Sequence, residues 1–190
     1  MTKSPTVRAD PWRVLVNVAQ IPHDGLHRDI EADSATRAAM AEIAGLREIL
    51  SARASFDLNP GSDGRVHVEG HLTARVGQSC VVTLEPIEND IDEHIDLVFA
   101  PAGDVQALAD TLDEEAESGE VPEPPEPIEN GMIDLGRLAT DVLFLAIDPY
   151  PRKEGAVFEP PVAAADPEDH PFAALKALKG AATNGGSDKA

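Results

Sequence analysis

The run of residues 66–99 constrains this chain more than any other segment, because apolar and polar side chains alternate through most of it. Successive side chains of a β-strand point to opposite faces, so a period of two predicts strands with one buried and one solvent-facing side. A break at Gly77 and a turn at residues 85–86 divide the run into neighbouring strands. Residues 80–84, which are nearly all apolar, are predicted to form a short strand between these breaks. The pattern as a whole predicts an antiparallel meander.

Weaker patterns on either side add further strands and two helices. Short strands are expected at residues 12–18 and 26–30, where they would start the sheet, and another at residues 52–58. Apolar residues spaced three or four apart predict the helices. These run from an N-cap at Asp33 or Ser34 to about Leu50, and from an N-cap at Asp134 to a stop before Pro149. We therefore expect an α+β fold, in which an antiparallel β-meander sheet or partly closed barrel is packed by two helices.

The composition predicts one folded domain with flexible additions. The chain is 42% hydrophobic, but its 16 prolines, 14 glycines and 4% aromatic content suggest that part of it does not join the core. An acidic, proline-rich loop at about 101–130 cannot bury enough apolar surface to offset the entropy lost on ordering. The predicted organisation is a flexible N-terminus (1–11), a single α+β domain (12–149) that carries the disordered acidic insert, and a flexible C-terminal tail (150–190) with a short helix at about 171–179.

The charge is strongly negative and unevenly distributed. The net charge is −20, and residues 76–136 hold seventeen Asp and Glu but no Lys or Arg. Such a block repels nucleic acid and attracts basic partners. Residues 1–75 are nearly neutral, with nine Lys and Arg against ten Asp and Glu, and are able to present a basic surface. The candidate RNA contacts are Arg53, Arg65 and Arg75.

The residues that suggest catalysis or metal binding favour simpler interpretations. Cys80 lies in an apolar run with no adjacent cation to lower its pKa, so we expect a small buried side chain rather than a nucleophile. His67 and His71 would be about 13 Å apart in a strand and are expected on its solvent face, not on a shared metal ion. A cysteine hydrolase that pairs Cys80 with one of these histidines or with His94 is the least favoured alternative. We expect neither enzymatic activity nor a metal or other cofactor.

The sequence also predicts a cytoplasmic location without membrane insertion. No run approaches the roughly 18 apolar residues of a membrane-spanning helix, and the first ten residues lack the apolar core of a secretory signal. The single cysteine, Cys80, fits a reducing compartment.

Several short motifs occur along the chain in a fixed order, namely Cys80, Leu84, Glu85 and Pro86; Asp134, Leu135 and Gly136; residues 148–153; and Pro171, Phe172, Leu175, Leu178 and Lys179. The order of these motifs and of the predicted elements resembles the YceD family, whose members support the accumulation of large-subunit ribosomal RNA in bacteria and plastids. Many relatives carry Cys-x-x-Cys at the turn and a second cysteine pair after the last helix, which suggests zinc. This chain has Thr83 at the second position and no cysteine after Cys80, so we do not extend metal binding to it.

The resemblance implies a non-enzymatic, bacterial-type ribosome-biogenesis factor that supports 23S rRNA processing, stability or accumulation. Its partner would be large-subunit precursor rRNA or an assembly intermediate. The alternative is an acidic protein-binding module, in which residues 104–129 mimic RNA and chaperone a basic ribosomal protein. Removing these residues distinguishes the two hypotheses, because RNA binding should persist or strengthen whereas chaperoning should fail.

Overall fold

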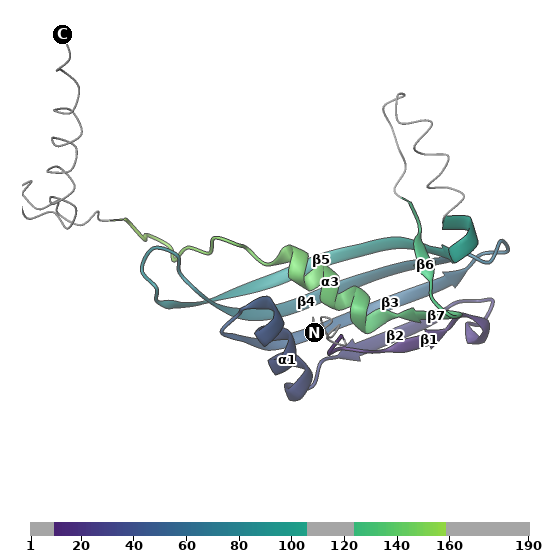
Figure 1. Cartoon of the computed structure of the whole chain (residues 1–190), viewed down its shortest axis with the longest axis horizontal. Coiled ribbons are helices and arrows are strands. Elements are labelled where there is room, and N and C mark those ends of the chain that lie inside the picture. The colour runs from purple at the N-terminus through teal and green to yellow at the C-terminus, as the bar shows by residue number, and fades with distance from the viewer. Residues whose placement is uncertain (1–9, 106–123, 159–190) are drawn as a thin grey trace, which may run out of the picture. The chain divides into compact units, whose positions relative to one another are not determined.

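The computed structural model describes residues 10–105 and 124–158. These residues form two β-sheets, whose strand pairs are mostly antiparallel, and the helices α1 and α3 (Figure 1). The larger sheet has five strands in the order β2-β3-β4-β5-β6, and a smaller one pairs β1 with β7. The described elements are β1 (Leu15–Asn17), the 3-10 helix η1 (Val18–Gln20), β2 (Leu26–Glu31), α1 (Ser34–Ala44), β3 (Glu48–Pro60), β4 (Val66–Ser79), β5 (Pro86–Pro101), β6 (Glu126–Ile128), β7 (Met132–Asp134) and α3 (Leu135–Ala146).

The chain divides at Val157 into two units, and every element named above belongs to the first. The acidic insert predicted at about 101–130 lies mostly outside the described residues, since 106–123 are not described. Most of the N-terminal segment and the tail with its predicted helix lie outside them as well.

Strands β3, β4 and β5 form a continuous antiparallel meander, as the alternating pattern predicts. Their register places Phe56 of β3 beside Gly70 of β4 and Gly70 beside Ile95 of β5. On the inward face of β4, Val66, Val68, Leu72 and Val76 are fully buried. The outward residues are at least partly exposed from His67 to Arg75. The α+β class and the antiparallel meander are therefore confirmed.

The alternative of a partly closed barrel is wrong, because the sheet stays open. β2 lies at one edge and pairs only with β3. At the other edge, β6 is parallel to β5 and pairs only with Phe99, Ala100 and Pro101. The two edges therefore belong to different strands that do not meet, and the sheet has one covered face and one open face.

Three local predictions are wrong for identifiable reasons. β4 continues through Gly77 to Ser79, and residues 80–84 form a turn rather than a strand. The first helix ends at Ala44, because Gly45 adopts a left-handed conformation with φ of 67° and closes the helix, and the following residues then pair as β3. β1 does not start the sheet with β2 but pairs with β7.

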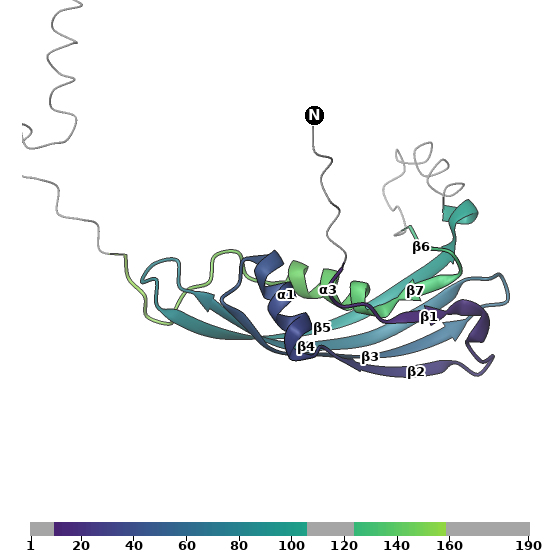
Figure 2. The ribbon, with the colours of Figure 1, turned by 60° about the horizontal axis from the view of Figure 1, so that its bottom comes forward.

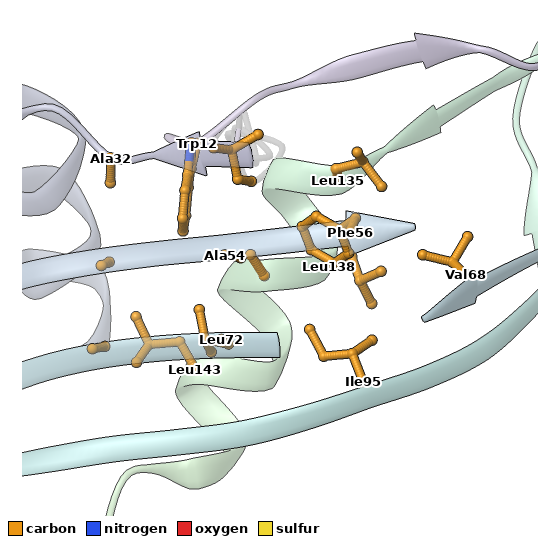
Figure 3. Close-up of a cluster of buried hydrophobic side chains, with 14 of the residues drawn as sticks. Trp12, Ala32, Ala54, Phe56, Val68, Leu72, Ile95, Leu135, Leu138 and Leu143 are labelled. Atoms are coloured by element: carbon orange, nitrogen blue, oxygen red, sulfur yellow. The ribbon is translucent and has the colours of Figure 1, made fainter. Parts of the chain in front are cut away.

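Both helices lie on the same face of the five-stranded sheet (Figure 2). Figure 3 shows Leu138 and Leu143 of α3 directed at the sheet, near Phe56 and Leu72. Gly70 makes room for the Phe56 ring, since a Cβ added there would lie 2.6 Å from Phe56 Cδ1. The sequence of α3 is apolar almost all round, but its Leu145 is 87% exposed. One side of α3 is therefore left uncovered.

Candidate functional site

The turn between β4 and β5 contains Cys80, Leu84 and Glu85, and it is held by its own backbone. The Cys80 amide donates to the Glu85 carbonyl at 2.9 Å, and the Leu84 amide donates to the Cys80 carbonyl at 2.9 Å. Leu84 has φ of 62°, a left-handed conformation that is uncommon for a branched residue. Its side chain is 76% exposed and so gains little from burial. A strained and exposed leucine is a signal of function rather than of folding.

The segment that follows α3 is fastened to this turn by hydrogen bonds. The Val81 amide donates to the Pro151 carbonyl at 2.9 Å, and the buried Gln78 side chain donates to the Asp148 carbonyl at 2.8 Å. Lys153 Nζ lies 2.9 Å from Glu85 Oε2, and this ammonium lowers the pKa of Glu85. Residues 148–153 and the turn therefore form one assembly at this end of the sheet.

The Cys80 sulfur is at the centre of the assembly. It is fully buried, as predicted, and accepts hydrogen bonds from the amides of Lys153 at 3.3 Å and Thr83 at 3.4 Å. These donors stabilise the thiolate and lower the pKa of Cys80 to about 6. The sequence shows no adjacent cation that would lower this pKa, but the donors that lower it are backbone amides, which the identity of adjacent side chains does not reveal.

The arrangement does not assemble a cysteine hydrolase or a metal site from the described residues. His71 is eight residues before Ser79 in β4, a distance of about 26 Å along the strand. His94 lies opposite His71 in the register and is equally distant, and His67 is farther away. Within residues 10–105 and 124–158, no three His, Cys, Asp or Glu side chains are placed to hold a metal ion. Cys80 thus serves as a hydrogen-bond acceptor that joins two segments.

The motif Asp134-Leu-Gly at the start of α3 holds the fold together. Asp134 Oδ1 accepts hydrogen bonds from the amides of Gly136 and Arg137 at 3.2 Å, and from the amide of Val14 at 2.9 Å. Leu135 is fully buried. At Gly136 an added Cβ would lie 2.4 Å from the Trp12 carbonyl oxygen, so only glycine allows this approach. We assign these three residues to capping and packing, not to ligand contact.

Each of the three arginines predicted from the sequence to contact RNA forms an ion pair with a carboxylate. Arg53 lies 3.0 Å from Glu31, and Arg75 lies 2.8 Å from Glu88. Arg65 precedes β4 and pairs with a neighbouring aspartate, Asp63, at 3.4 Å. Arg65 and Arg75 are ten residues apart, which is about 33 Å along a strand. These arginines remain predicted contacts, but a phosphate would have to displace a carboxylate at each one.

Four other arginines lack an ion-pair partner in the part of the chain that the structure describes, namely Arg28, Arg37, Arg47 and Arg152. Arg37 donates instead to the backbone carbonyls of Ala32 and Ile49. Two of the four arginines belong to the end of the sheet that carries the Cys80 turn. The Arg47 amide donates to the Gly77 carbonyl at 3.0 Å, beside the Gln78 that holds Asp148. Arg152 is exposed within the segment fastened to the turn.

An exposed aromatic ring stands at the same end. Tyr150 is 71% exposed and lies two residues from Arg152, and its amide donates to Asp148 Oδ1 at 2.8 Å. We call Arg47, Leu84, Tyr150 and Arg152 the turn-end surface. The distribution of charge along the sequence points to the strand arginines. Only the tertiary structure shows that the turn-end surface combines exposed apolar groups with arginines that have no described carboxylate partner.

No helix within the described residues is both long and apolar enough to cross a membrane. Searches of curated proteins and of solved structures gave no match. A family model with the description "Large ribosomal RNA subunit accumulation protein YceD" matches residues 68–179, which is more than half of the chain. This match begins in β4 and includes the Cys80 turn, the Asp134-Leu-Gly motif and the 148–153 segment. The protein therefore belongs to the YceD family of large ribosomal RNA subunit accumulation proteins.

Proposed function

We propose that this protein is a non-enzymatic factor in the maturation or stability of large-subunit ribosomal RNA, and that it contacts this RNA directly through the turn-end surface. The family name implies a role in large-subunit rRNA accumulation. The observation that carries the proposal of direct contact is the pair of arginines, Arg47 and Arg152, that have no carboxylate partner among the described residues.

Unpaired nucleotides suit the chemistry of this surface. Single-stranded RNA is bound by cations that contact phosphates and by aromatic rings on which bases stack. Tyr150 has an exposed ring, and Arg152 lies on the same segment, which is held by hydrogen bonds to the Cys80 turn. The Cys80 hydrogen bonds keep this segment in place before RNA arrives, which reduces the entropy lost on binding.

A non-enzymatic role agrees with the chemistry of the described residues. The Cys80 sulfur is fully buried, which keeps a substrate from reaching it, and the histidines of β4 and β5 are far from it. The histidines that have close partners are bonded to carboxylates, as in the pair of His67 Nε2 and Asp96 Oδ1 at 2.6 Å. Such pairs stabilise an exposed sheet face and do not form a nucleophile.

Ultraviolet crosslinking followed by RNA sequencing tests the proposal. We expect the full chain to crosslink to large-subunit precursor rRNA in lysate, with the peptide that contains Tyr150 among the crosslinked peptides. Tyr150→Ala and Arg152→Ala should each weaken RNA binding, the first by about 5- to 150-fold if one base stacks on the ring. Under this proposal RNA contacts the turn-end surface and not Arg53, which is paired with Glu31, so Arg53→Ala is the matched control and should leave binding almost unchanged. Enrichment of no ribosomal RNA, or a larger loss with Arg53→Ala, would contradict the proposal.

The second candidate is the acidic module that chaperones a basic ribosomal protein, and one observation favours it. The open face of β5 presents Asp90, Asp92 and Asp96, and the 106–123 segment adds seven carboxylates without a cation. Deletion of 106–123 leaves β6 intact. Loss of a basic ribosomal protein from nuclease-treated pull-downs after this deletion would favour the chaperone, whereas unchanged or stronger RNA binding would favour direct contact.

A further inference from the structure

Along most of the outer side of β5, the residues that the structure describes form no paired strand. β5 runs from Pro86 to Pro101, but β6 occupies its outer side only at residues 99–101. Over residues 87–98, β5 pairs on its inner side with β4, and no described strand pairs on its outer side. The unpaired amides and carbonyls of such an edge form a template for an additional strand.

A groove of about 750 Å³ runs along this edge between β5 and α3. It is lined on the sheet side by Ile95 and Leu97 and on the helix side by Val142 and Leu145. Leu145 is the most exposed large apolar side chain of the described residues. The groove continues the line of β6, whose Glu126 and Pro127 form part of its end. An added strand would therefore bury one side against α3.

The other side of an added strand would meet carboxylates. Asp90, Asp92 and Asp96 of β5 point to the open face, with side chains between 60% and 78% exposed. Their partners on β4 are Arg75 for Asp90 and two histidines, His71 and His67, for Asp92 and Asp96, so one arginine faces three carboxylates along this strand pair. At the mouth of the groove, Arg137 is near Asp141, Glu129 and Asp10 at 3.7, 3.8 and 3.9 Å, so one cation serves three carboxylates there. Partial burial raises the pKa of Asp141, whose side chain remains 63% exposed.

We propose that the β5 edge is a docking site for an extended protein segment in which basic and apolar residues alternate. The segment adds as a strand along residues 90–98, with its apolar residues against Leu97, Val142 and Leu145 and its Lys or Arg residues beside the carboxylates of the open face. Main-chain hydrogen bonds to β5 provide the affinity, and the alternation of basic and apolar side chains in the segment provides the specificity. This site is separate from the turn-end surface and does not depend on RNA binding there.

Charge identifies the occupant as a basic partner rather than a second copy of this chain. Two β5 edges placed side by side would bring Asp90, Asp92 and Asp96 of each copy together, and like charges across an interface oppose pairing. The same carboxylates repel the phosphates of an RNA strand. A basic segment would hydrogen-bond to the unpaired backbone of β5 and place its cations beside the carboxylates of the open face.

A synthetic peptide of ten residues that alternates Val with Lys or Arg tests this site on the full chain. Two control peptides share its composition, one with the basic and apolar residues in separate blocks and one with N-methyl groups on alternate amides. We expect only the alternating, unmethylated peptide to bind in fluorescence anisotropy. It should shift the amide resonances of residues 90–98 and 142–145 and slow amide exchange along β5.

Variants of the protein locate the binding. Leu145→Lys should weaken the alternating peptide about tenfold or more, because it removes the apolar contact and adds a like charge. Val81→Lys places the same change on an exposed residue of the Cys80 turn and should have no effect. Absence of binding, equal binding of either control peptide, or equal loss with Val81→Lys would overturn the proposal. If added RNA shifts the amide resonances of residues 90–98, the assignment to a protein partner is wrong. None of these outcomes changes the crosslinking expected at Tyr150, so this test is independent of the proposed RNA contact.

Discussion

The two faces of the five-stranded sheet are built from the same strands but are held by different forces. On the covered face, Phe56, Leu72 and Val68 are fully buried under the helices. On the open face, the same strands present charges in cross-strand pairs, such as Arg53 with Glu31. Burial of apolar surface is worth several kilocalories per mole for a large side chain, whereas exposed ion pairs contribute at most about 1 kcal/mol. Stability therefore resides in one face, and the other is left for interactions.

The largest effect is expected at Phe56 on the covered face. Phe56→Ala should lower the free energy of unfolding by about 3–5 kcal/mol, because it leaves a cavity beneath the helices. Ser55→Ala, at the neighbouring position that points to the open face, is the control and should change it by less than about 0.5 kcal/mol. Urea denaturation measures both. Equal losses at the two positions would break the contrast between the faces.

A smaller loss is expected at Gly136, where α3 meets the N-terminal strand. Gly136→Ala places a methyl group against the Trp12 carbonyl, and overpacking of this kind costs about 1–3 kcal/mol. Thermal or urea denaturation measures the loss. Gly131→Ala provides a comparison, since an added Cβ there meets nothing within 4 Å and any loss arises from its φ of 74° alone. A neutral Gly136→Ala would show that the start of α3 is free to move away.

The Cys80 turn is expected to show a dependence on pH. The pKa of the thiol falls from an ordinary value of 9.0 to about 6 in the folded protein, so folding favours the thiolate. The resulting stabilisation is fully present above pH 9 and is lost as the pH falls toward 6. Under reducing conditions, the difference in free energy of unfolding between the wild type and Cys80→Ser should therefore grow from pH 6 to pH 9. A constant difference would mean that the sulfur remains a thiol.

The smallest effect is expected on the open face. Arg53→Ala removes the ion pair with Glu31, whose side chains are 66% and 58% exposed, and should change the free energy of unfolding by about 0–1 kcal/mol. Raising the salt concentration should reduce even this difference. A loss as large as that of Gly136→Ala would show that the open face takes part in holding the fold.

The parts of the fold that were predictable are those in which local pattern and tertiary burial agree. Alternation through β4 and β5 identified the buried face correctly, and Asp134 was recognised as the N-cap of α3. The apolar run at residues 80–84 was misread because apolar content alone does not separate a strand from a turn fastened to another segment. The length of α1 was misread because a glycine cap at Gly45 outweighed the apolar spacing that continued beyond it.

The candidate site was less predictable than the fold. The sequence drew attention to Arg53, Arg65 and Arg75, and it had no means to show that each would find a carboxylate. Arg152 and Arg47 were overlooked because they are separated by about a hundred residues and share an end of the sheet only through Gln78 and Asp148. Pairing of charges depends on distances in space, which no spacing along the chain reports.

The sequence by itself determined the class of the fold, the inward and outward faces of the long strands and the family of the protein, because each depends on local periodicity or on short motifs in order. Only the tertiary structure decided which arginines have a carboxylate partner, how two amides stabilise the Cys80 thiolate, and that, among the described strands, only β6 pairs with the outer edge of β5, at residues 99–101. These features arise where segments distant in the sequence meet. They depend on contacts and burial in space, which the order of residues along the chain does not show.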